Sequence, residues 1–134
     1  MNDVQAKQSQ RKVTPELIRE IAAAFNSRDA DKIVSYFTED CTFLMASGPE
    51  PVGRTVHGKA TLRKVLADRF KVIPDMSWHH QYEYVCGDRA VSVWTVTGKS
   101  KDGTVLNYQG CDLWEFKDGL VHNKDTYWKI VRPD

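Results

Sequence analysis

The sequence of 134 residues has no long hydrophobic run and few cysteines. Its apolar stretches are too short for a membrane-spanning helix, and the polar segment from Met1 to Lys12 lacks the apolar core of a secretory signal. The three cysteines are widely spaced and show no paired Cys or Cys/His metal-binding spacing. This pattern predicts reduced, mostly buried thiols in a cytoplasmic protein without metal or cofactor.

An excess of charge of one sign is also missing. Nineteen basic residues stand against 18 acidic residues, for a net charge of +1, and no basic cluster follows the first residues. This balance predicts neither a nucleic-acid surface nor a membrane surface. The length suits one domain with its own core. We expect a loosely ordered tail over residues 1–12, which shows no apolar periodicity, and a single domain over 13–134.

Helix signals are concentrated in the first half of the chain. Thr14 followed by Pro15 predicts an N-cap and the first helical position. Asp29 is a suitable cap for a second, short helix, and residues 42–44 read as a short strand. The glycines and prolines of 46–57 predict a loop over one end of the domain. A third helix is expected over about 58–70.

Everything after this point reads as β structure. Residues 76–86 alternate, so that Trp78, His80, Tyr82 and Tyr84 are expected on one face. Residues 89–99 are rich in valine and threonine, and turn signals separate the strands. Helices followed by a four-stranded antiparallel meander predict an α+β fold.

The most informative segment is the last hairpin, from Tyr108 to Ile130. Its turn contains Asp118-Gly119, and this pair between alternating apolar runs is a strong hairpin signal. Because side chains alternate along a strand, Asp112 shares a face with Tyr108 and Trp114. A carboxylate on such a face must be paired, solvated in a cavity or neutralised.

The register of this hairpin leaves two neighbours open for Asp112. A plain two-residue turn places Asp112 opposite Asp125, and two adjacent carboxylates cannot both ionise cheaply. A bulge shifts the pairing by one and brings Lys124 beside Asp112, which gives an ion pair. The residues alone do not decide between the two.

Taken in order, these segments resemble the nuclear transport factor 2-like superfamily, with its SnoaL-like branch nearest and the ketosteroid isomerases as cousins. The likeness covers roughly residues 14–131 and is carried by YFTEDCTF at 36–43, HGKA at 57–60 and WEFKDG at 114–119. It implies a cystatin-like cone, in which three helices wrap a curved antiparallel sheet around an apolar pocket. It also implies a small hydrophobic or polyketide-like ligand and a homodimer formed through the outer face of the sheet.

The resemblance carries over only part of the isomerase chemistry. The position of the isomerase general base falls at Met45, which cannot take a proton, and the oxyanion-hole tyrosine falls at about Ile21. The second oxyanion donor falls on Asp112, and the same alignment favours the bulged hairpin because it puts Trp128 in the pocket. In a dry pocket Asp112 would be a neutral acid for proton transfer next to a carbonyl, whereas hydrogen bonds from neighbours would make it structural.

Other residues are weaker candidates. His57 lies before the third helix, where loop capping competes with a role as base, and His80 is more plausibly structural. Two function classes stay open: an isomerase- or cyclase-type enzyme with Asp112 as acid/base, and a non-catalytic ligand-binding or protein-interaction module. A dehydratase or epoxide-hydrolase relative would need a second pocket acid or a histidine dyad, and His80 and Asp125 are the only candidates for it. The predicted ligand-binding residues are Phe25, Met45, Tyr108, Trp114, Asp125 and Trp128.

Overall fold

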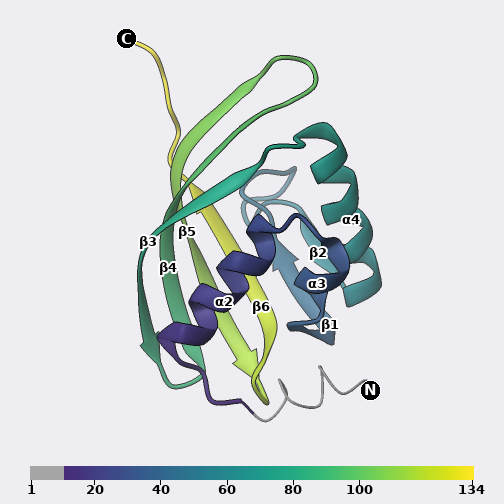
Figure 1. Cartoon of the computed structure of the whole chain (residues 1–134), viewed down its shortest axis with the longest axis vertical. Helices are drawn as coiled ribbons and strands as arrows, with labels where there is room; N and C mark the ends of the chain where they lie inside the picture. Colours follow the sequence, from purple (N-terminus) through teal and green to yellow (C-terminus); the bar gives the residue numbers. More distant parts are fainter. Residues whose placement is uncertain (1–10) are drawn as a thin grey trace.

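Helices cover one face of a curved sheet in the computed structural model, which describes residues 11–134 (Figure 1). The helices are α2 (Pro15–Asn26), α3 (Ala30–Val34) and α4 (Lys59–Val72). No helix among the described residues is long and apolar enough to cross a membrane. Residues 1–10 of the predicted tail lie outside the described part of the chain.

Six strands form a single sheet in the order β2-β1-β6-β5-β4-β3. Their bounds are β1 (Phe37–Leu44), β2 (Thr55–His57), β3 (Ser77–Cys86), β4 (Arg89–Lys99), β5 (Val105–Lys117) and β6 (Leu120–Trp128). The last four strands form the predicted antiparallel meander, and β1 joins it by pairing in parallel with β6. The prediction of an α+β fold with a helix-wrapped sheet is confirmed.

The predicted helix caps are also present. The Thr14 hydroxyl accepts a hydrogen bond from the Leu17 amide at 3.1 Å, and Asp29 accepts one from the Lys32 amide at 3.2 Å. Each cap satisfies an amide that has no partner inside its helix. The buried side of α2 then packs Leu17 and Ile21 against the sheet.

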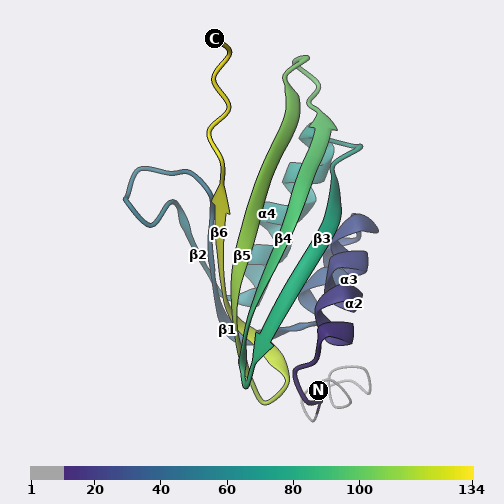
Figure 2. The same ribbon diagram turned by 90° about the vertical axis from the view of Figure 1, so that its left-hand side faces the viewer.

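The two faces of the sheet differ. The inner face meets the helices and buries the largest core residues, among them Phe37, Phe43 and Val121. The opposite face of β3, β4 and β5 has no described helix in front of it (Figure 2). Alternation along the strands therefore separates residues that line the cone from residues that face outward.

The last hairpin is bulged. Asp118 and Gly119 both have positive φ, 53° and 80°, as a tight two-residue turn requires. Lys117 pairs with Leu120, but the register then shifts because His122 is an extra residue between two ladder pairs. Asp112 consequently pairs with Thr126. The bulged alternative is the one that the structure shows.

A second bulge corrects the expected face of β3. His80 pairs with Trp94 and Tyr82 with Val93, so Gln81 is an extra residue. The alternation is therefore interrupted between His80 and Tyr82. His80 lies on the inner side, near the cone, whereas Tyr82 is 47% exposed on the outer side. The prediction of one shared aromatic face was wrong because a bulge leaves no clear mark in the sequence.

Gly110 makes room for an inward-facing indole. It is the cross-strand partner of Trp94, whose ring lies across it. A β-carbon at Gly110 would lie 2.6 Å from the Trp94 ring and 2.5 Å from the Tyr127 carbonyl oxygen. Any larger residue would force the ring or the β5–β6 ladder to move.

We predict that Gly110→Ala destabilises the protein by about 1–3 kcal/mol, the usual cost of overpacking a core. Urea denaturation followed by circular dichroism measures the change. Asn107→Ala is the matched control, because Asn107 is exposed on the same strand. Equal free energies of unfolding for the two variants would contradict the close packing over Gly110.

Candidate functional site

Asp112 is the centre of a buried polar cluster on the inner face of β5 and β6. Its side chain is 6% exposed, and its two oxygens accept hydrogen bonds from the Trp94 indole at 2.9 Å and the Thr126 hydroxyl at 2.7 Å. The Lys124 ammonium lies 3.0 Å from the same carboxylate. Three donors thus surround the carboxylate, which compensates for the loss of water around a buried charge.

Lys124 is equally well enclosed. Its side chain is 6% exposed, and its ammonium donates to the Thr126 hydroxyl at 2.7 Å. The ammonium also lies 4.2 Å from the centre of the Phe43 ring, within cation–π range. Burial lowers the pKa of Lys124, and the neighbouring Asp112 charge opposes that shift. Specific partners rather than water therefore surround the Lys124 ammonium.

Two cavities meet at this lysine. Asp112 lines only the smaller one, of about 20 Å³, together with Ser92 and His80. That volume is near the size of a single water and cannot admit an organic ligand. The larger pocket, of about 370 Å³, lies on the other side of Lys124 and does not include Asp112 in its wall.

The larger pocket is the candidate ligand site. Its volume lies at the lower end of the range for small-molecule sites. Aromatic rings form much of its wall, and Tyr108 stacks on Trp128 with ring centres 5.4 Å apart. Ala46 and Ser47 contribute from the β1–β2 loop, as the predicted position of this loop over one end of the domain requires. The remaining positions belong to α2, β1, α4, the segment between α4 and β3, β3 itself, β6 and the segment after β6.

Most of the predicted ligand-binding residues lie in this wall. They are Phe25, Met45, Tyr108 and Trp128. Trp114 differs: it is 4% exposed and its indole donates to the Ser92 hydroxyl at 2.9 Å, inside the core. Asp125 also differs, because the bulge places it between two inward residues and turns it to the outer face. These two assignments to the pocket are corrected.

The two histidine candidates lie apart. His57 is exposed on β2, 3.5 Å from the Thr42 hydroxyl, and lines neither cavity. His80 lines the small cavity, with its ring 3.0 Å from the Glu83 carboxylate. The fold therefore does not assemble a His80–Asp125 pair, since the two side chains lie on opposite faces of the sheet.

Sequence reasoning missed Arg69 as a pocket residue. Arg69 follows the apolar positions of α4, where a charged residue in the last turn reads as an exposed helix terminus. In the structure it is partly buried and lines the large pocket. A local signal was present, because Arg69 lies three residues after Leu66 and seven after Leu62, on the buried side of α4. Its place in the pocket wall depends on where the end of α4 meets the sheet.

The cysteines differ in burial and lie far apart in the sequence. Cys41 is fully buried, and this burial raises the pKa of its thiol to about 11. Cys86 is exposed, which corrects the expectation of mostly buried thiols for that residue. Within residues 11–134 there is no group of three or more side chains suited to hold a metal ion.

Comparison with known proteins defines the class. A model of the SnoaL-like domain matches residues 18–123. The match covers most of the chain, so the chain belongs to the SnoaL-like domain family. Curated protein sequences give no significant match.

Solved structures show the same fold. A hypothetical protein with a ketosteroid isomerase-like fold from Catenulispora acidiphila, in complex with trimethylamine, is 18% identical with a TM-score of 0.77, and 88% of each chain is covered. A cystatin-fold protein from Novosphingobium aromaticivorans is 25% identical with a TM-score of 0.71, over 83% of this chain and 94% of the other. TerC, co-crystallised with polyporic acid, is 25% identical with a TM-score of 0.71, over 87% and 92%.

We predict strong coupling between Asp112 and Lys124. Lys124→Met and Asp112→Asn should each destabilise the fold by about 3–5 kcal/mol, since each leaves one buried charge without its partner. The double variant should cost clearly less than the sum of the two, as urea denaturation would measure. The exposed pair Arg63–Asp31 is the control and should show little coupling. Additive losses at Asp112 and Lys124 would contradict the ion pair.

Proposed function

We propose that this SnoaL-like domain binds a small, largely apolar aromatic molecule in the pocket between α4 and the inner face of the sheet. The observation that carries the proposal is the 370 Å³ pocket with its aromatic wall. Such a wall offers apolar area and ring-stacking geometry beside a smaller number of polar and basic groups. Of its rings, Trp78 and the stacked pair Tyr108–Trp128 are partly exposed and thus available to a ligand.

The surroundings of Asp112 favour binding over proton transfer. A catalytic acid or base has to reach the atom whose proton it moves. Asp112 lies behind Lys124, and its oxygens already accept bonds from Trp94 and Thr126. At the pocket itself, the position of the isomerase base is the thioether of Met45. The non-catalytic alternative of the two function classes is therefore the better supported one.

The structural neighbours support a small-molecule role. One was solved with trimethylamine and another with polyporic acid. Both molecules are small enough to be held by a single domain, which agrees with the size of the pocket in this chain. These complexes support the class of function and do not specify the ligand.

A neutral fluorescent hydrophobe tests the pocket. We predict that N-phenyl-1-naphthylamine binds with enhanced fluorescence, and that Ala46→Trp weakens its binding roughly tenfold by filling the pocket mouth. The matched control is Ala23→Trp, at an exposed position of α2, which should bind like the wild type. Equal affinity of the probe for the wild type and the Ala46→Trp variant would show that the probe binds elsewhere, and it would contradict the assignment of this pocket as the ligand site.

We also propose that the domain forms a homodimer through the outer face of the sheet. This face exposes Tyr82, Tyr84, Leu113 and Tyr127 at 47%, 70%, 40% and 53%. A depression of about 410 Å³ runs between Tyr84 and Leu113. Exposed aromatic area of this kind is typical of protein–protein interfaces.

Sedimentation equilibrium tests the assembly at micromolar concentration. We expect a dimer for the wild type and a shift towards monomer for Leu113→Glu, because a buried unpaired carboxylate disfavours an apolar interface. Val72→Glu is the control, since Val72 is exposed at 53% on the helical side. A monomeric wild type would contradict this interface.

A further inference from the structure

The wall of the large pocket carries positive charge only. Among its residues are Arg69, Lys124 and, at the end of β6, the exposed Lys129. No aspartate or glutamate from the described residues is part of this wall. The pocket thus combines an apolar, aromatic surface with cationic groups from α4 and from β6 and its end. This combination says more about the ligand than the volume does.

The charges around the cone do not cancel. Asp112 and Lys124 neutralise each other across 3.0 Å. Arg69 remains, and within residues 11–134 its guanidinium has neither an ion pair nor a side-chain hydrogen bond. Lys129 has no ion pair among these residues either, so the balance next to the pocket is positive, with the partly buried Arg69 as the charge nearest the interior.

Burial makes this charge costly. It lowers the pKa of Arg69, and the charge of Asp112 opposes the shift only in part. The same cause acts on Lys124, where the positive charge of Arg69 adds to the lowering. Two cations that disfavour each other across a pocket are both stabilised when an anion enters it. Relief of this repulsion adds to the binding energy of a negatively charged ligand.

Lys124 is prepared to meet such an anion. The Asp112 carboxylate and the Thr126 hydroxyl hold its ammonium from behind, and the Phe43 ring lies against it. The lysine nevertheless lines the large pocket as well as the small one. A cation that its neighbours hold in place loses little conformational freedom when a ligand pairs with it.

We propose that the ligand is an aromatic organic anion, whose carboxylate or acidic enol group pairs with Arg69 and Lys124 while its rings lie against Tyr108 and Trp128. This inference rests on the proposed binding function and adds the charge class of the ligand. Arg69 is the main selector, since the charge of Lys124 is already shared with Asp112. A planar guanidinium also suits the two oxygens of a carboxylate.

Matched pairs of ligands isolate the charge. Isothermal titration calorimetry would compare benzoate, 2-naphthoate and biphenyl-4-carboxylate with the corresponding neutral amides, and with 2-naphthylmethylamine as the cation. We expect the best carboxylate to bind roughly tenfold or more tightly than its amide. The amine should bind most weakly, and added salt should reduce the preference for the acid.

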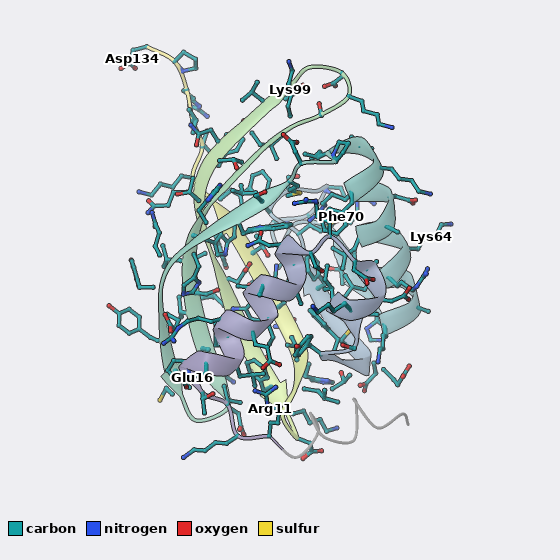
Figure 3. All side chains as sticks on the ribbon, viewed as in Figure 1. Arg11, Glu16, Lys64, Phe70, Lys99 and Asp134 are labelled. Atoms are coloured by element: carbon teal, nitrogen blue, oxygen red, sulfur yellow. The ribbon has the colours of Figure 1, made fainter. Side chains whose placement is uncertain are left out.

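Variants of α4 assign the preference to Arg69. Arg69→Met removes the guanidinium while keeping an apolar stem, and it should abolish the difference between acid and amide with little effect on the amide. Lys64→Met is the matched control, because Lys64 is exposed on the same helix and points away from the sheet (Figure 3). Circular dichroism of each variant verifies that the fold is retained.

The outcomes separate the two proposals. Equal binding of acids and amides overturns the anion inference and leaves the ligand-binding function standing. If the Arg69→Met variant still prefers acids over amides, the assignment of this preference to Arg69 is overturned. If neither the naphthyl and biphenyl series nor N-phenyl-1-naphthylamine binds at millimolar concentration, the proposed binding function itself fails.

Discussion

The ion pair between Asp112 and Lys124 is the interaction on which the rest of the cone depends. Two charges leave water here, and this loss exceeds their mutual attraction unless further partners are present. Trp94 and Thr126 complete the shell of the carboxylate, and aromatic rings surround the ammonium. The packing of Trp94 over Gly110 brings the indole donor to Asp112, and the bulge of β6 turns Lys124 inward, so both features support this pair.

The pair also divides the interior into two parts. Behind it, a cavity near the size of one water leaves Asp112 without access to an organic molecule. On its other side lies a pocket with an aromatic wall, which Lys124 of the pair helps to line. Asp112 therefore holds a lysine at the edge of the larger pocket. What a buried carboxylate can do is thus set by its neighbours and not by the fold alone.

The two bulges determine which side chains lie on each face of the sheet. One extra residue at His122 turns Lys124 inward and Asp125 outward. Another at Gln81 keeps His80 near the core and releases Tyr82 and Tyr84 to the outer face. A slip of one residue in either strand would exchange these faces, because side chains alternate with a period of two. Register is thus as important for this site as residue identity.

Local chemistry in the sequence determined the helix starts at Thr14 and Asp29, the turn at Asp118-Gly119 and the α+β order of elements, because caps and tight turns depend on a few adjacent residues. It also identified Asp112 as a charge that needs a partner. Only the tertiary structure decided that the partner is Lys124, that Trp114 and Asp125 leave the pocket, and that Arg69 enters it. These outcomes depend on bulges and on where the end of α4 meets the sheet, which are settled by packing between distant segments rather than by neighbouring residues.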